Sequence, residues 1–221
     1  MQLPDDVHLK LATFDPEQAA SWARMLSEEE RQRMAGFKSA KRRQEFLLGR
    51  VVVRSLLGEL IGVEPSEVYL GIHAGGALEC TLYPYYISLA HSGDRAVAVA
   101  SSRQVGVDME RINTRHPDLP RFLLHPEEYA LLDATPLERD RLIILLWTIK
   151  EATLKAMRTG LRISPTKLRT LIDLERQTAT VCFEEASAWQ ALFEQVGDCY
   201  LSVVFPEQPV EDVSGRFADR P

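Results

Sequence analysis

The sequence has few cysteines, no long apolar run and no excess of positive charge, and each shortage excludes a class of protein. Cys80, Cys182 and Cys199 show neither Cys-x-x-Cys nor metal-ligand spacing, which argues against a disulfide-stapled or zinc-stabilised domain. An odd number of cysteines without a framework indicates reduced thiols, as in cytoplasmic proteins. No apolar stretch approaches the ~20 residues that cross a membrane, and the N-terminal MQLPDDVHLKLATF is too polar for a signal peptide. We therefore expect a cytoplasmic protein with no membrane partner.

Charge is spread unevenly along the chain. Its 221 residues fit one ordinary domain or two small ones, and the formal net charge of −6 argues against a nucleic-acid binder. Although the whole chain is acidic, residues 31–54 form a basic segment. It contains Arg31, Arg33, Lys38, Lys41, Arg42, Arg43, Arg50 and Arg54. The segment suits a polyanionic ligand or an acidic partner, but the solvated face of an amphipathic helix has the same composition.

Apolar periodicity predicts a mixture of strands and helices. Ser27 with Glu30 three residues later forms a capping-box pattern for a short helix, and an apolar stripe predicts a longer helix over 39–61. Alternating residues predict strands at 68–72, 86–90, 95–101, 104–109, 168–175, 178–184 and 199–205, after a first strand at 7–14.

A second long helix is predicted in the C-terminal part of the chain. Thr135 and Glu138 form another capping-box pattern, and the helix that they open should run through Arg158 and end at Gly160. Residues from about 206 onward have little to bury and are expected to be mobile.

A weak internal repeat links the two parts of the sequence. GDRAVAVAS begins at Gly93, and GDCYLSVVF begins at Gly197, 104 residues later. Each segment would be a Gly-Asp turn followed by a strand, although such turns are common in hairpins.

Two short segments carry the chemistry. In VGVDMERI, residues i and i+2 of a strand share a face, so Asp108 and Glu110 point the same way. In WTIKEATLKA, Glu151 and Lys155 lie one turn apart on one helix face. Either pattern alone is commonly surface decoration. Together they form a set that can hold Mg²⁺ and a phosphate chain, because Mg²⁺ takes one or two carboxylates plus substrate phosphates.

The motifs resemble those of the Sfp-type 4′-phosphopantetheinyl transferases over most of the chain. That family has a His-Ser pair after a strand, a Gly-Val/Ile-Asp-x-Glu strand end and a Trp-x-x-Lys-Glu-x-x-x-Lys helix. The sequence shows them in this order, as ISLAHSGDRAVAVA (87–100), VGVDME (105–110) and WTIKEATLKA (147–156). The N-terminal SEEERQRMAGF and KRRQEFLLGRVVVRSLLG are also similar to the family.

The resemblance implies a fold and a reaction. The fold is α+β and sandwich-like, with two similar halves, 1–104 and 105–221, related by pseudo-twofold symmetry, each with helices packed on an antiparallel sheet. The reaction is Mg²⁺-dependent transfer of the 4′-phosphopantetheine arm of coenzyme A to a serine of an acyl or peptidyl carrier protein, with release of 3′,5′-ADP. The size resembles the monomeric branch of the family.

The resemblance also assigns site residues. Asp108, Glu110 and Glu151 would hold Mg²⁺, or Mn²⁺ in its place. Glu151 would take the serine proton, directly or through water, and Lys155 would hold a phosphate and steady the leaving group. The expected contacts to coenzyme A are Arg43 and Arg50 at the 3′-phosphate, Arg33 as a further candidate, and Gly75, Gly76, Ala90, His91, Ser92, Asp108 and Lys155.

Two departures from the family pattern leave alternatives open. Ala90 stands where the family has Ser or Asn, and AGGALE replaces a Gly-Lys-Pro loop, so one hydroxyl and one lysine contact are missing. A non-catalytic homologue that binds coenzyme A or a carrier would explain degenerate loops, and a Mg²⁺-dependent pyrophosphate hydrolase would use the same metal. The intact acidic and helical motifs favour the transferase.

Overall fold

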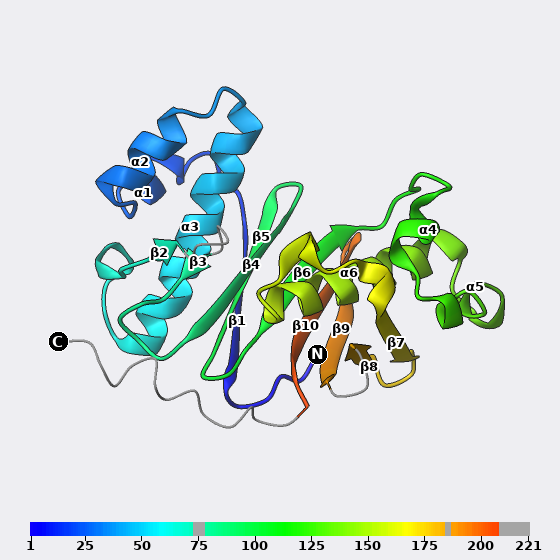
Figure 1. The fold of residues 1–221 in the computed structure, drawn as a ribbon. Coiled ribbons are helices and arrows are strands. Elements are labelled where there is room, and N and C mark those ends of the chain that lie inside the picture. Colours follow the sequence, from blue (N-terminus) through cyan, green and yellow to red (C-terminus); the bar gives the residue numbers. More distant parts are fainter. Residues whose placement is uncertain (73–77, 184–186, 208–221) are drawn as a thin grey trace.

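The computed structural model describes residues 1–72, 78–183 and 187–207, and it forms two α/β halves that lie side by side (Figure 1). The N-terminal half contains the antiparallel sheet β1-β5-β4, and the C-terminal half contains the antiparallel sheet β6-β10-β9-β8-β7. The predicted α+β class with antiparallel sheets is therefore confirmed. No helix in the described ranges is both long and apolar enough to cross a bilayer.

The N-terminal half is built around one long helix. In chain order its elements are β1 (Val7–Thr13), α1 (Ala19–Ala23), α2 (Glu28–Ala35), α3 (Ala40–Ile61), η1 (Pro65–Glu67), β2 (Gly71–Ile72), β3 (Leu78–Glu79), β4 (Tyr86–Ser92) and β5 (Arg95–Ser101). The capping box predicted for α2 is present, with Ser27 and Glu30 bonded reciprocally. Ser39 caps α3, and Gly62 ends it with a positive φ of 74°.

The C-terminal half repeats this order with a larger sheet. Its elements are β6 (Gly106–Arg111), α4 (Leu119–Leu123), η2 (Pro126–Glu128), α5 (Leu131–Ala134), α6 (Arg139–Ala156), η3 (Gly160–Arg162), η4 (Pro165–Lys167), β7 (Leu168–Asp173), β8 (Thr178–Phe183), β9 (Ser187–Val196) and β10 (Cys199–Pro206). The second predicted capping box is absent, because the Thr135 hydroxyl accepts from Leu137 N–H and Glu138 makes no side-chain cap.

The two halves share a topology. In each, the first strand pairs with the last strand, and the last strand pairs in turn with the one before it, giving β1-β5-β4 and β6-β10-β9. The Gly-Asp turns of the sequence repeat join the final hairpin of each half, and both glycines take positive φ, 65° at Gly93 and 62° at Gly197. The faint repeat in the sequence thus corresponds to a repeated hairpin.

Four apolar cores lie among the described residues, and three of them hold the layers and the halves together. One lies between α3 and the N-terminal sheet, and a second lies between α6 and the C-terminal sheet. A third joins the halves, because Val97 and Val99 of β5 pack with Val107 of β6 and Leu201 of β10. Strand β4 lies beside β6, where Val107 N–H donates to Ser88 Oγ at 3.1 Å, so the His-Ser strand and the acidic strand end are brought together.

Candidate active site

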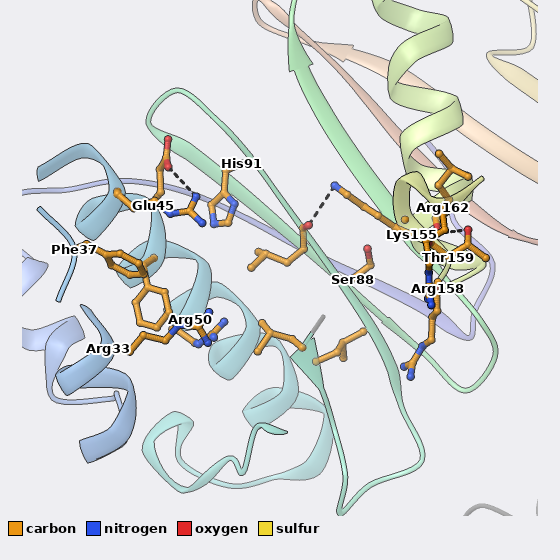
Figure 2. Close-up of a pocket in the computed structure, with 17 residues that line it drawn as sticks. Arg33, Phe37, Glu45, Arg50, Ser88, His91, Lys155, Arg158, Thr159 and Arg162 are labelled. Carbon is orange, nitrogen blue, oxygen red and sulfur yellow. Dashed lines mark hydrogen bonds and ion pairs between the residues drawn. The ribbon is translucent and has the colours of Figure 1, made fainter. Parts of the chain in front are cut away.

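A cavity of about 830 Å³ opens between the halves, a volume in the usual range of ligand sites (Figure 2). It is bounded by α2 and α3 on one side and by the end of α6 on the other, with β4 between them. Its lining residues are Arg33, Phe37, Arg42, Glu45, Phe46, Arg50, Leu78, Ile87, Ser88, Leu89, His91, Leu154, Lys155, Arg158, Thr159, Gly160 and Arg162. Six of these residues are arginine or lysine and only Glu45 is acidic, which suits a polyanionic ligand.

The α2–α3 wall holds Arg50 in a defined position. Its side chain is only 9% exposed, and its Nε lies 2.8 Å from the carboxylate of Glu30. The guanidinium stacks over the Phe46 ring at 4.6 Å, and Arg33 lies over the same ring at 5.8 Å. Burial lowers the pKa of Arg50, but an arginine keeps its charge. The predicted Arg33 and Arg50 are thus brought to one end of the cavity.

Arg43 takes a different direction. Its exposed guanidinium donates to the carbonyls of Phe37 and Lys38, and it is not among the lining residues. Its neighbour Arg42 lines the cavity and forms an ion pair with Glu45. A one-residue step along a helix turns a side chain by ~100°, so Arg42 faces the cavity and Arg43 does not.

Strand β4 divides the His-Ser motif between two environments. His91 faces the cavity with Leu89, whereas Ala90 lies in the core between the sheets. Ser92 is buried and accepts from the Cys199 thiol at 3.8 Å. Alternation along a strand explains the split. The structure therefore brings His91 to the cavity, and Ala90 and Ser92 away from its lining.

The His91 ring packs on the backbone of α3. A Cβ added to Gly49 would lie 2.4 Å from His91 Nε2, so the absence of a side chain at 49 makes room for the imidazole. Burial lowers the pKa of His91, and nearby Lys155 lowers it further, while Glu45 opposes them. The residue still reaches solvent, so water weakens these effects. A mainly neutral imidazole at neutral pH can donate one hydrogen bond to a phosphate oxygen.

Lys155 joins the two halves at the floor of the cavity. Its Nζ donates to Asp108 Oδ1 at 2.7 Å and to Val107 O at 3.1 Å, both on β6, and to Leu89 O at 3.4 Å on β4. Asp108 is buried, and its Oδ2 has no hydrogen-bond partner among the described residues. This unsatisfied carboxylate oxygen is available to a cation.

Asp108 lies close enough to Glu110 and Glu151 to act on both electrostatically. Burial raises the pKa of both glutamates, and the charge of Asp108 raises each of them further. Glu110 additionally raises the pKa of Glu151, while Arg115 offsets the effect at Glu110 through an ion pair of 2.6 Å. Two glutamates whose ionisation is disfavoured beside Asp108 form with it a site where a cation would be stabilising.

In the part of the chain that the structure describes, no group of three or more His, Cys, Asp or Glu side chains is arranged to hold a metal ion. The carboxylates nevertheless fit Mg²⁺, because it usually takes one or two carboxylates and completes its shell with water and substrate phosphates. The buried, unpartnered Oδ2 of Asp108 is the strongest sign of such a fit.

The two lysines of WTIKEATLKA have different surroundings. Lys155 is half-buried at the cavity, whereas the side chain of Lys150 is 0% exposed and lies 2.6 Å from the carboxylate of Glu128. Lys150 also donates to Leu123 O and Pro165 O. It therefore ties α6 to the segment around η2 and does not face the cavity.

Some lining residues could not be anticipated, and two predicted ones lie outside the described residues. Gly75 and Gly76 belong to the latter group. Arg42, Arg158 and Arg162 also line the cavity and were not among the predicted site residues. Arg158 and Arg162 follow Lys155 by 3 and 7 residues. Helical periodicity could not predict which way they face, because α6 ends at Ala156.

Comparisons with known proteins identify the family of this chain. The profile described as "4'-phosphopantetheinyl transferase superfamily" matches residues 104–205. The 4′-phosphopantetheinyl transferase HetI of Nostoc sp. is 34% identical over 89% of this chain and 85% of its own length. The 4′-phosphopantetheinyl transferase Sfp of Bacillus subtilis is 25% identical over 63% of this chain and 69% of its own length.

A solved structure of holo-[acyl-carrier-protein] synthase from Neisseria meningitidis aligns with a TM-score of 0.41, over 48% of this chain and 98% of that one. The identity and coverage shared with HetI are those of a common family. The chain belongs to the 4′-phosphopantetheinyl transferase superfamily.

Proposed function

We propose that this 4′-phosphopantetheinyl transferase binds coenzyme A in the cavity between its halves and carries out transfer beside Asp108, Glu110, Glu151 and Lys155. The enzyme moves the phosphopantetheine group from coenzyme A to a carrier protein. The observation that carries the proposal is that the cationic cavity and the three carboxylates meet at Lys155. Lys155 lines the cationic cavity and also lies 2.7 Å from Asp108 in the carboxylate cluster.

The cationic cavity accounts for binding of the nucleotide end. Coenzyme A has a 3′-phosphate and a diphosphate, and arginine forks meet phosphate oxygens two at a time. Arg50 and Arg33 lie together on the Phe46 ring at one end of the cavity. We place the 3′-phosphate there, and the diphosphate between His91 and Lys155.

The carboxylate cluster accounts for the chemistry. When bound at Asp108, Glu110 and Glu151, Mg²⁺, or Mn²⁺ in its place, supplies charge neutralisation at the reacting phosphate. Phosphoryl transfer needs positioning and electrostatic stabilisation more than covalent help. Lys155 holds a phosphate oxygen as a point charge and stabilises the leaving 3′,5′-ADP.

Glu151 is our proposed general base for the attacking serine. Burial and Asp108 raise its pKa, which makes the carboxylate a stronger base than an exposed glutamate. The proton passes from the serine hydroxyl to Glu151, directly or through one water, while the serine oxygen bonds to the β-phosphorus. The bond between that phosphorus and the bridging oxygen breaks, and the oxygen leaves with the electron pair as part of 3′,5′-ADP. Both walls of the cavity belong to one chain, so we propose that the monomer is sufficient for transfer to acyl or peptidyl carriers.

The test is mass measurement of an apo carrier protein after incubation with the enzyme, coenzyme A and Mg²⁺. A gain equal to phosphopantetheine is expected, and Asp108→Ala should abolish it while the protein stays folded. No change in carrier mass would favour a non-catalytic binding protein. Breakdown of coenzyme A without carrier modification would favour a pyrophosphate hydrolase.

A further inference from the structure

Arg158 occupies a backbone position that favours glycine. The chain leaves α6 through a Schellman arrangement, in which Thr159 N–H donates to Leu154 O at 3.2 Å and Arg158 N–H donates to Lys155 O at 3.0 Å. Arg158 is the residue with left-handed conformation in this motif, at φ 56°. A side chain there is strained relative to glycine. An arginine at such a position suggests a use for its side chain.

The side chain of Arg158 is held against the cavity by groups from the other half. Its guanidinium lies over the Tyr86 ring at 5.0 Å and its Nη1 lies 3.9 Å from the carboxylate of Glu79. The 3.9 Å separation is that of an ion pair and is too long for a hydrogen bond. Figure 2 shows Arg158 on the same side of the cavity as Lys155, whereas Arg33 and Arg50 lie at the opposite end.

We propose that Arg158 is a further substrate-binding residue that contacts the diphosphate of coenzyme A. This inference rests on the proposed function of the cavity. Arg158 is the next cation after Lys155 along this wall of the cavity, three residues later in the chain, and we place the remaining oxygens of the diphosphate there. The guanidinium fork can take phosphate oxygens bidentately, and the Tyr86 ring supports its other face.

The rival explanation is structural, with Arg158 serving only to join the halves through Tyr86 and Glu79. Two substitutions separate the explanations. Arg158→Gly removes the cation and relieves the strained backbone, while Arg158→Lys keeps the charge without the fork. The matched control is Gln177→Gly, because Gln177 is the other described non-glycine residue with positive φ, at 55°, in the turn between β7 and β8.

The experiment measures the KM for coenzyme A and for 3′-dephospho-coenzyme A, the Kd for both by calorimetry, and the Tm. For Arg158→Gly we expect KM and Kd to rise about tenfold with both ligands, on the scale of a charge-assisted hydrogen bond, with Tm at or above the wild-type value. Arg158→Lys keeps the charge but not the fork, so it should recover only part of the affinity. Gln177→Gly should raise Tm and leave KM and Kd within twofold of wild type.

Three results for Arg158→Gly would overturn the inference. Its Kd could stay within twofold of wild type, or its Tm could fall while Kd is unchanged. Its Kd could also rise for coenzyme A and stay unchanged for dephospho-coenzyme A. The last would assign Arg158 to the 3′-phosphate. Failure of the proposed function is distinguishable, because wild-type protein would then leave the carrier unmodified whatever the behaviour of Arg158.

Discussion

The buried lysine of the helix motif permits a sharp test of which residues support the fold and which support the chemistry. Lys150 and Glu128 have side chains that are 0% and 1% exposed and lie 2.6 Å apart. Glu128 also accepts from His125 N–H at 2.8 Å and from Thr170 N–H at 2.7 Å. Lys150→Met therefore leaves a buried carboxylate without its countercharge.

Removing one member of a buried pair costs about 3–5 kcal/mol. For a chain of this size, each kcal/mol shifts Tm by about 2–4 °C, so Tm should fall by roughly 6–20 °C. The matched control is Lys167→Met, since Lys167 is exposed, and its unfolding free energy should change by less than about 0.5 kcal/mol.

The assay is urea unfolding combined with carrier modification at a temperature where each variant is folded. Turnover of folded Lys150→Met should stay near that of wild type. Adding Glu128→Gln should cost less than the sum of the two single changes, because the partners form one network. A Lys150→Met variant that unfolds within about 1 kcal/mol of wild type and still loses its turnover would refute the assignment of Lys150 to the fold.

Three further results are expected. Arg50→Ala should raise the KM for coenzyme A about tenfold, the scale of a lost charge-assisted hydrogen bond, and scarcely affect dephospho-coenzyme A; equal losses with both would exclude the 3′-phosphate contact. Gly49→Ala should displace the His91 ring and lower kcat/KM for coenzyme A about tenfold, even though alanine stabilises the helix by about 1 kcal/mol. Unchanged kinetics would show that the position of the ring is unimportant. Burial and Asp108 raise the folded-state pKa of Glu110, so its ionisation costs stability as pH rises from the unfolded-state value through the folded-state pKa. In metal-free buffer Glu110→Gln should therefore gain stability over wild type across that window, and an advantage found only at lower pH would contradict the sign.

Local signals predicted much of the fold. Helix α3 follows its predicted range closely, because an N-terminal serine cap, an apolar stripe and a glycine at the C-terminus all agree. Strand β9 was missed altogether. Trp189, Leu192, Phe193 and Val196 repeat at helical spacing, but both faces of this strand are covered, so its apolar residues do not alternate simply.

In the candidate site, the residues on regular elements were easier to predict than the cations of the cavity wall. Asp108, Glu110, Glu151 and Lys155 sit on regular elements whose periodicity fixes which side chains share a face, and Lys155 indeed meets Asp108. The cations of the cavity wall depend on packing between elements. Arg42 lines the cavity instead of Arg43, and Arg158 reaches it through a backbone turn that no sequence pattern announced.

The sequence also could not separate the lysines of the helix motif. Lys150 and Lys155 have the same chemistry, and the difference lies in what surrounds them. Lys150 meets Glu128, which is 22 residues earlier in the chain and belongs to a short 3₁₀ turn. Such a pairing follows from tertiary packing, which periodicity along one helix does not describe.

The most direct test of the central claim is Glu151→Gln, with coenzyme A binding measured by calorimetry and carrier modification measured by mass on the same preparation. The amide can neither accept the serine proton nor supply a full charge to Mg²⁺. The account predicts coenzyme A affinity close to that of wild type and loss of most turnover. Normal binding with carrier modification at a near wild-type rate would contradict it, and would exclude Glu151 as the general base.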